Sequence, residues 1–506
     1  MKLSRYTLKN ITSEKVIVPD QEIFELPEKV LQFGTGILLR GLPDYFIDRA
    51  NRNGVFNGRV VMIKSTAKGD ASSYDKQDGL YTLCERGFKN GEKIEENIII
   101  SSVSRVLIAQ TDWSKILECA HDKNFEIIIS NTTEVGITLV HEDIKRFPPV
   151  SFPGKLLAIL YERFIAFNGS EDSGFVIVPT ELIVDNGKKL ESIVQELAHL
   201  NSLDDKFIEW LENCNYFCSS LVDRIVTGIP DKDIKESIEN ELGYTDELLT
   251  VSEVYSLWAI EGDKKIKDIL SFGKVEDGIV IEPNIDLHRE LKLRLLNGTH
   301  TLTCGLAFLA GYRTVRDAME DDLSSGFIEG LMKNEIAPSI PYKIDSKIKE
   351  TFISNVLDRF RNPHINHLWK NITLNYTSKV KMRCVPVLKK HYEKHDAPPV
   401  LFSLGFAAYL YFMKAVNQKD KAFYGEFNGE PYLIEDEMAP KFYKLWNSDK
   451  PVDVLIKEIL KDKDLWGEDL TRLPGFQQAI TDNLQGIVTN GAKATLEKIN
   501  QAIKSQ

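Results

Sequence analysis

The sequence predicts two domains, an α/β domain built on a parallel β-sheet and then a mainly α-helical domain. Its 506 residues exceed the roughly 100 to 200 residues of one ordinary domain. Short β-branched runs alternate with helical stretches in the first half, and long segments with helical periodicity replace them from about Ile285. We place the boundary so that the domains cover residues 1–283 and 284–506.

Four short apolar runs mark the strands expected in the first domain. Each run is bounded by polar residues or glycine, which is typical of strands buried on both faces of a parallel sheet. The runs are Lys29–Phe33, Arg59–Ile63, Glu126–Ile129 and Gly174–Val178. One last strand and a proline break are expected at Gly278–Asn284, just before the boundary.

Three longer segments with helical periodicity define the second domain, namely Leu287–Ala310, Ser346–Phe360 and Val400–Ala415. The longest apolar stretch, Val400–Met413, is interrupted by a serine and a glycine. It is shorter than the roughly 20 residues that cross a bilayer. We therefore expect a buried helix there and no membrane partner.

The composition is typical of a folded globular protein, with 43% hydrophobic and 27% charged residues. Lys plus Arg number 63 and Asp plus Glu number 75, so the net charge of −12 argues against nucleic acid or anionic lipid as a partner. The six cysteines form no recognisable zinc or disulfide pattern, and residues 1–30 contain no apolar targeting segment. We expect a cytoplasmic protein without a bound metal.

A glycine turn follows the first expected strand. Gly34–Gly36 precede a predicted helix start, and Arg40 lies in the first helical turn. Glycines in this order allow backbone N–H groups to approach a pyrophosphate at a helix N-terminus. The pattern predicts a Rossmann-like dinucleotide-binding domain. The third glycine of the usual pattern should fall at Leu39 and is missing, so a plain structural turn is the alternative.

The end of the second strand does not decide between NAD and NADP. NAD enzymes usually present an acidic residue to the ribose hydroxyls at this place. Here the strand is followed by Lys64-Ser65-Thr66, which would tolerate a 2′-phosphate. The local chemistry alone therefore leaves NADP open.

Lys292, Asn297 and His300 are the residues most indicative of chemistry. On an α-helix at about 100° per residue, they lie at roughly 0°, 140° and 80°, so they share one side with leucines between them. A lysine, an amide and an imidazole among leucines favour a partly buried general acid/base site over a solvated face. Each of the three taken alone would more often be structural.

Several segments together resemble the long-chain, metal-independent polyol dehydrogenases of the mannitol dehydrogenase type. They are Gly34–Gly36 with Arg40, Gln77–Tyr81, Ser130–Gly136, Val222–Ile225 and Lys292–His300. Within that family, Pro179–Gly187 and the stretch from Arg359 through Lys379 to Arg383 are most similar to the branch that acts on hexuronates.

The resemblance implies an NAD-linked reduction of a ketone on a sugar acid. Lys292 would be the acid/base residue, Asn297 and Asn186 would hydrogen-bond the carbonyl oxygen, and His300 would help to hold the substrate. Asp223 and Lys379 would lie in the substrate site. The cofactor-binding residues that it implies are Phe33, Gly34, Thr35, Gly36, Arg40, Asn131, Thr132, Thr133 and Glu134.

A hexuronate differs from a polyol by its carboxylate, so its binding site needs a cation. Lys370, Lys379, Lys381 and Arg383 form a basic stretch in the second domain. The guanidinium fork of Arg383 suits a carboxylate well, and a solvated basic face is the alternative.

The expected reaction is the NAD-dependent interconversion of D-tagaturonate and D-altronate in hexuronate (galacturonate) catabolism. A lysine and two amides would polarise the carbonyl group, so no metal is needed. Fructuronate reductase (mannonate dehydrogenase) and mannitol-type polyol dehydrogenase activities are the close alternatives. A non-catalytic dinucleotide-binding sensor is the alternative from another class.

Overall fold

The computed structural model describes residues 1–65, 71–132 and 135–504. It divides into two compact units. The N-terminal unit comprises residues 1–87 and 93–285, and the C-terminal unit comprises residues 88–92 and 286–506. The main division, after Ile285, lies close to the boundary expected from the sequence.

The N-terminal unit is built around a six-stranded parallel sheet with the order β5-β2-β1-β6-β7-β8. The four predicted strands are confirmed and form its centre. The strands are β1 (Glu28–Phe33), β2 (Arg59–Lys64), β5 (Val103–Ile108), β6 (Ile127–Ser130), β7 (Val176–Pro179) and β8 (Tyr216–Phe217).

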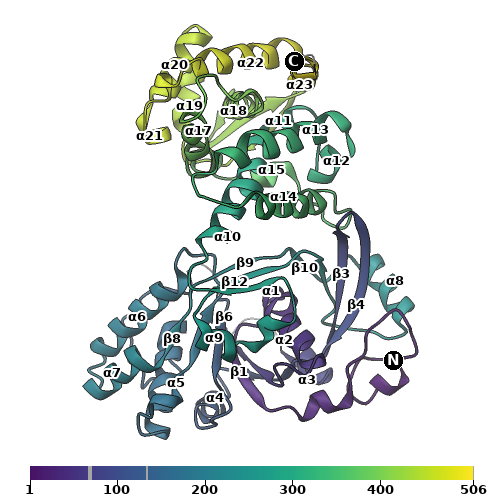
Figure 1. The fold of residues 1–506 in the computed structure, drawn as a ribbon, viewed down its shortest axis with the longest axis vertical. Coiled ribbons are helices and arrows are strands. Elements are labelled where there is room, and N and C mark those ends of the chain that lie inside the picture. The colour runs from purple at the N-terminus through teal and green to yellow at the C-terminus, as the bar shows by residue number, and fades with distance from the viewer. Residues whose placement is uncertain (66–70, 133–134, 505–506) are drawn as a thin grey trace. The chain divides into compact units, whose positions relative to one another are not determined.

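Helices cover both faces of this sheet because its strands are apolar on both sides. Leu31 and Phe33 of β1 pack into one core with the helices α4 to α7 (Figure 1), whereas Val30 packs into another core with α1 and α2. This alternation follows from the pleat of the strand. The helices are α1 (Ile37–Gly41), α2 (Pro43–Arg52), α4 (Trp113–Cys119), α5 (Phe152–Ala166), α6 (Asn186–Leu200) and α7 (Asp205–Cys214).

Two smaller sheets complete the N-terminal unit. A four-stranded sheet has the order β10-β11-β3-β4, with strands Val226–Gly228, Thr250–Glu253, Tyr81–Lys89 and Glu92–Ile100. A three-stranded sheet has the order β13-β12-β9, with strands Ile279–Glu282, Leu257–Glu261 and Ser220–Asp223. The strand β13 confirms the last predicted strand, and the other strands of these two sheets were not predicted. The remaining helices are α3 (Ser72–Lys76), α8 (Lys232–Leu242) and α9 (Lys264–Ile269).

The C-terminal unit is mainly helical, as predicted, and one apolar core runs through it. α14 (Ser346–Phe360) and α18 (Val400–Phe412) confirm two of the predicted helices, and α18 is buried along most of its length. The first predicted helix is present as α10 (Asp286–Leu291), a π-helical segment η5 (Lys292–Gly298) and α11 (Thr299–Leu309).

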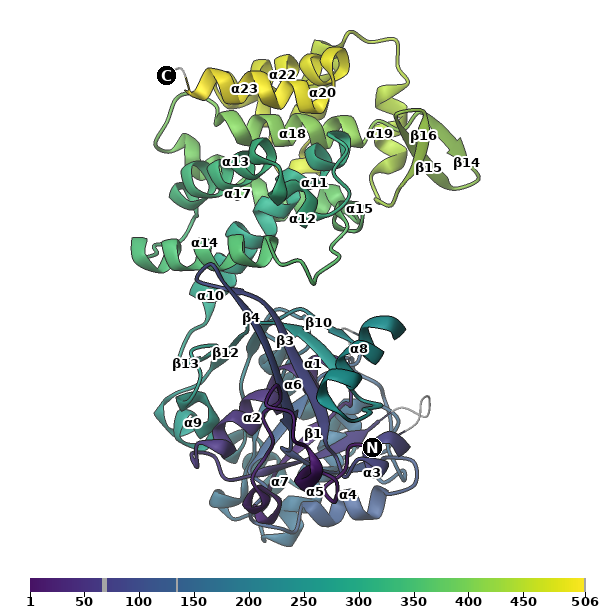
Figure 2. The ribbon, with the colours of Figure 1, turned by 90° about the vertical axis from the view of Figure 1, so that its right-hand side faces the viewer.

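The other helical segments of this unit are α12 (Val315–Glu320), α13 (Asp322–Gly330), the π-helical η6 (Leu331–Ile336), α15 (Trp369–Ile372), α16 (Tyr376–Lys379), the π-helical η8 (Val380–Cys384), α17 (Val385–Tyr392), α19 (Ala439–Trp446), α20 (Val452–Lys461), α21 (Lys463–Trp466), α22 (Phe476–Asn490) and α23 (Ala492–Lys504). A small antiparallel sheet, absent from the prediction, lies beside α19 (Figure 2), with strands β14 (Asn417–Lys419), β15 (Ala422–Phe427) and β16 (Glu430–Ile434). None of the helices in the described ranges is both long enough and apolar enough to cross a bilayer.

Candidate active site

The Gly34 turn and Asn131, both predicted to bind the cofactor, lie where the strand order of the parallel sheet reverses. β1 is hydrogen-bonded to β2 on one side and to β6 on the other, and the sheet continues outward from each. In open α/β sheets, ligands bind outside the carboxyl ends of the strands at such a reversal. The turn at Gly34 follows β1, and Asn131 follows β6, so both lie at this edge.

Gly34 occupies a position that only glycine can adopt without strain. Its φ is +129°, and a Cβ atom here would lie 3.0 Å from the carbonyl oxygen of Asn131 and 2.7 Å from the side chain of Leu39. Its N–H group donates to the carbonyl oxygen of Ile63. Leu39, which stands where the usual pattern has its third glycine, is buried beneath the turn.

Gly36 has space around it, because a Cβ atom built on it would lie more than 4 Å from the other described residues. It is exposed, has an extended backbone and directly precedes α1. The preceding residue, Thr35, accepts a hydrogen bond on its carbonyl oxygen from the hydroxyl of Tyr74. The side chain of Phe33 is fully buried against Phe152, so only its backbone is available to a ligand. The turn thus combines a fixed backbone with open space beside Gly36.

Glu181 holds the loops after β6 and β7 together and was missed by sequence reasoning. Its buried carboxylate accepts hydrogen bonds from the N–H and hydroxyl of Thr132 and from the hydroxyl of Ser130. Burial raises the pKa of this carboxyl group. The side chain of Asn131 donates to Thr180. Thr133 and Glu134 lie outside the described residues.

The structure places the side chain of Arg40 inside the N-terminal unit. The residue is 6% exposed, and its guanidinium donates to the carbonyl oxygen of Leu248 at 2.7 Å. The same group lies 5.6 Å from the ring centre of Tyr81. Its visible role is therefore to tie α1 to the segment that precedes β11.

Asn186 is also buried, and backbone groups engage its side-chain amide. It is 0% exposed, and its amide nitrogen donates to the carbonyl oxygens of Pro179, Glu181 and Ser220. Its amide oxygen accepts from the N–H groups of Gly187 and Ser220. These backbone groups use the donors and acceptor of the amide, so we interpret Asn186 as the residue that fixes the start of α6.

Asp223 ends β9 in the same unit and is 7% exposed. The next residue, Arg224, is anchored by Glu85 and by the carbonyl oxygens of Gly41 and Glu253. The part of the Val222–Ile225 segment around Arg224 is therefore structural, while the carboxylate of Asp223 remains the candidate for substrate contact.

The π-helical segment η5 changes the predicted relation between Lys292 and Asn297. A π-helix bonds each residue to the one five positions away, whereas an α-helix bonds residues four apart. Asn297 follows Lys292 by five residues, so in η5 the two are neighbours on one face rather than about 140° apart. Both side chains are half-buried. π-helical turns occur frequently at functional sites.

His300 lies on α11 directly after η5 and is packed among aromatic rings. It stacks on Phe360 with 4.2 Å between ring centres and contacts His367 and Trp369 edge-on. Within the described ranges, its Nε2 atom has no hydrogen-bond partner. Burial lowers the pKa of His300 well below its usual value, and the nearby His367, Arg359, Arg383 and Lys379 lower it further. The imidazole is therefore neutral and keeps an unused polar atom.

A second π-helical segment packs against the first and carries Arg383. Arg294 of η5 donates to the carbonyl oxygens of Met382 and Arg383. In return, Arg383 donates to the hydroxyl of Thr301, which itself donates to the carbonyl oxygen of Asn297. Arg383 is thus linked to the same helical turn as Asn297.

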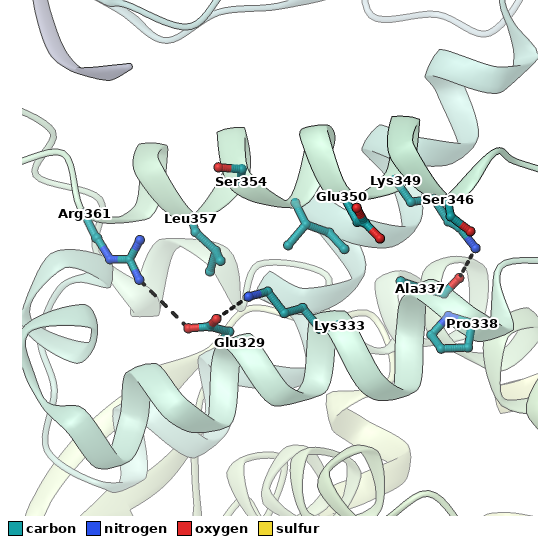
Figure 3. A pocket seen from close by; sticks show the side chains of 11 residues that line it. Glu329, Lys333, Ala337, Pro338, Ser346, Lys349, Glu350, Ser354, Leu357 and Arg361 are labelled. Atoms are coloured by element: carbon teal, nitrogen blue, oxygen red, sulfur yellow. Dashed lines mark hydrogen bonds and ion pairs between the residues drawn. The ribbon is translucent and has the colours of Figure 1, made fainter. Parts of the chain in front are cut away.

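A separate groove of about 580 Å³ lies in the C-terminal unit and contains none of the predicted residues. It runs between α14 and the α13–η6 helix (Figure 3). Glu329 pairs with Lys333 on its own helix and with Arg361, at the end of α14, across the groove. Because these charges are already matched, we derive no catalytic role from this groove.

All six cysteines are free, and no group of three or more potential metal ligands occurs within residues 1–65, 71–132 and 135–504.

Comparison with known proteins agrees with this arrangement. Residues 28–271 match the mannitol dehydrogenase Rossmann domain, and residues 284–488 match the mannitol dehydrogenase C-terminal domain. The altronate oxidoreductase of Bacillus subtilis (strain 168) is 37% identical over 477 residues, covering 94% of this chain and 95% of that protein. The altronate oxidoreductase of Escherichia coli O7:K1 is 34% identical over 483 residues, covering 94% and 97%.

Two solved structures share the fold over almost the whole chain. Mannitol 2-dehydrogenase of Pseudomonas fluorescens, in a ternary complex with NAD and D-mannitol, is 21% identical with a TM-score of 0.69 and covers 99% of this chain and 100% of that chain. D-sorbitol dehydrogenase in substrate-free form is 20% identical with a TM-score of 0.79 and covers 98% and 100%. With both domain matches and near-full-length relatives above 30% identity, the chain belongs to the mannitol dehydrogenase family.

Proposed function

We propose that this protein is an NAD-dependent oxidoreductase that interconverts D-tagaturonate and D-altronate, with Lys292 as the general acid/base. The observation that carries the proposal is the convergence of a lysine, an amide and an imidazole on one helical segment, in a chain 37% identical to proteins named altronate oxidoreductase. The reaction belongs to hexuronate catabolism in the cytoplasm.

The N-terminal unit fits a dinucleotide. The glycine turn leaves open space at Gly36 for close approach of a pyrophosphate, and the edge where the strand order reverses is the usual place for such a ligand. Bound NAD would supply or accept the hydride. Residues Phe33 to Gly36 through their backbone, and Asn131 and Thr132 at the end of β6, are the contacts that we propose.

Lys292 and Asn297 have different roles at the substrate oxygen. During reduction, the ammonium group of Lys292 donates a proton to the carbonyl oxygen, and the side-chain amide of Asn297 donates a hydrogen bond to the negative charge that develops there. During oxidation, neutral Lys292 removes the hydroxyl proton. The π-helical geometry of η5, in which residues five positions apart are neighbours, supports their action on the same oxygen.

His300 and the basic residues of the C-terminal unit hold the substrate. The Nε2 atom of His300, which has no hydrogen-bond partner among the described residues, is available to a sugar hydroxyl. Lys379 and Arg383 lie near His300, and Asp223 is the candidate from the N-terminal unit. The substrate is a small sugar acid, and neither nucleic acid nor membrane takes part.

Steady-state assays test this proposal by following NADH absorbance with D-tagaturonate, D-fructuronate and D-fructose as substrates. We expect the highest kcat/KM with D-tagaturonate and a preference for NADH over NADPH. Highest activity with D-fructuronate or D-fructose would instead establish one of the close alternatives. Stabilisation by NADH without turnover of any of the three would indicate a dinucleotide sensor and would contradict the proposal.

A further inference from the structure

The basic stretch from Lys370 to Arg383 separates into residues that are already engaged and residues that are not. Lys370 lies 3.6 Å from the carboxylate of Glu435, and Lys381 donates to the carbonyl oxygen of Asp464 at the surface. In the described part of the chain, Lys379 and Arg383 form no ion pair. These two residues therefore keep their charge available.

Arg383 offers most of its hydrogen-bonding capacity. Among the residues that the structure describes, its side chain forms one hydrogen bond, from Nη1 to the hydroxyl of Thr301 at 3.1 Å. A guanidinium group carries five N–H donors in a planar fork. The remaining donors are sufficient for a bidentate contact with a carboxylate.

Lys379 and His367 also lie near the imidazole of His300. Lys379 donates one of its three protons to the carbonyl oxygen of Ile372 at 2.9 Å. His367 contacts His300 edge-on, with 5.2 Å between ring centres. Together with Arg383, they bring three potentially cationic groups to the neighbourhood of His300, which we call the cationic cluster (His367, Lys379 and Arg383).

The members of the cationic cluster disfavour one another's charge. Burial lowers the pKa of Lys379, and the nearby Arg383 lowers it further. Burial also lowers the pKa of His367, with Arg359 and Lys379 adding to the effect. Cys304 and Asp436 act on the pKa of Lys379 in the opposite direction, and both carboxylate oxygens of Asp436 already accept backbone N–H groups. An anionic ligand would relieve this repulsion.

We propose that the cationic cluster binds the carboxylate of the sugar acid and selects uronates over uncharged sugars. Arg383 makes the bidentate contact, Lys379 supplies a second charge, and His367 donates a hydrogen bond from its ring. The inference rests on the proposed function, because it assumes that His300 and Lys292 face the substrate. It adds His367 as a specificity residue, which neither the sequence nor the family match assigns.

The test compares Arg383→Met and His367→Leu with Lys381→Met, a charge-matched control from the same helical segment. The kcat/KM of each is measured with NADH and a keto-uronate, and with the matching uncharged ketose. We expect Arg383→Met to lose about 10- to 100-fold on the keto-uronate, as loss of a charged hydrogen bond does, and less than about 3-fold on the ketose. His367→Leu should lose less, with the same selectivity, and Lys381→Met should match the wild type.

If the enzyme does not turn over the uncharged ketose, the selectivity is measured by ligand binding instead. Calorimetric titration of the NAD complex with an aldonate and with the matching alditol reports the same difference without catalysis. Equal losses on charged and uncharged ligands would overturn the carboxylate assignment, and so would an unchanged preference for the aldonate in Arg383→Met. Arg383→Lys keeps the positive charge, so it should retain part of the preference for the aldonate. If Arg383→Lys loses binding of both ligands as Arg383→Met does, the loss comes from a folding defect and the carboxylate assignment is wrong.

The two proposals fail in different ways. If the wild-type enzyme reduces no keto-uronate, the proposed function is wrong. If it does so and the cluster variants lose activity equally on both substrates, only the carboxylate site is wrong. Competition by inorganic phosphate that disappears in Arg383→Met without any effect on keto-uronate would assign the cluster to phosphate instead.

Discussion

The imidazole of His300 stacks on the ring of Phe360 with 4.2 Å between ring centres and 8° between ring planes. This contact fixes the orientation of the imidazole and removes it from water. Burial is the largest reason that the pKa of His300 lies well below its usual value. The folded protein therefore binds fewer protons than the unfolded chain below about pH 6.5.

It follows that His300 makes the protein less stable as the pH falls through 6.5. The free energies of unfolding of the wild type and of His300→Gln are measured with denaturant. Below pH 6.5, the wild type should lose roughly 1.4 kcal/mol per pH unit relative to His300→Gln. The exposed His199→Gln is the control and should shift little. A difference that is constant from pH 8 to pH 5 would show that His300 can be protonated in the folded state.

Alanine substitutions at the two glycines of the turn after β1 should have different effects, one on stability and the other on NADH binding. Gly34→Ala places a Cβ atom against the Asn131 carbonyl at a positive φ, so we expect a loss of about 1 to 3 kcal/mol of unfolding free energy. Gly36→Ala meets open space and should remain within about 0.5 kcal/mol of the wild type. Its dissociation constant for NADH, measured by fluorescence titration, should nevertheless rise at least about 10-fold. Unchanged NADH binding in Gly36→Ala would place the pyrophosphate elsewhere.

The main effect of Asn186→Ala should be a loss of unfolding free energy rather than a loss of kcat. Removal of the amide leaves buried carbonyl and N–H groups of Pro179, Glu181, Gly187 and Ser220 without their partner. The expected cost is about 2 to 4 kcal/mol by denaturant unfolding. Asn213→Ala, which removes one exposed hydrogen bond, is the control. A variant of wild-type stability with kcat reduced by orders of magnitude would instead support direct contact with the substrate.

Asp44 introduces a pH dependence of the opposite sign. Its carboxyl group is fully buried near Gln32, Tyr81, Arg40 and Asp48, and burial is the main cause that raises its pKa to about 7. The folded protein binds more protons than the unfolded chain between about pH 4 and pH 7, so Asp44 lowers stability as the pH rises through this range.

Asp44→Asn removes this titration. We expect its stability relative to the wild type to improve from pH 5 to pH 8, by on the order of 1 kcal/mol per pH unit up to pH 7. Asp396→Asn, at an exposed position, should show no such trend. If both variants follow the wild type in parallel across this range, Asp44 is ionised in the folded protein throughout.

The sequence was sufficient for the features that depend on local residue patterns. The parallel strands, the Gly34–Gly36 turn and the long helices follow from apolar periodicity and glycine placement, and the structure contains them. The π-helical form of Lys292–Gly298 could not be read in this way, because the leucine pattern around it fits an α-helix equally well.

The engagement of individual polar side chains was also beyond the sequence. The hydrogen-bond partners of Asn186 depend on how β7, α6 and β9 pack against one another. No local sequence pattern specifies this packing. The same holds for Arg40 and for Glu181, whose carboxylate organises the loop that carries Thr132. The signal available for Glu181 was an acidic residue that closely follows the predicted strand Gly174–Val178.

The most direct test of the account is the kcat of Lys292→Met beside that of Lys381→Met, with NADH and saturating D-tagaturonate. Loss of a general acid/base residue should lower kcat by about 10² to 10⁴ in Lys292→Met, while NADH binding and thermal stability stay close to wild type. Lys381→Met should retain full activity, because its ammonium group is bound to the Asp464 carbonyl at the surface. A Lys292→Met enzyme that turns over at the wild-type rate would contradict the assignment of Lys292 as the proton donor.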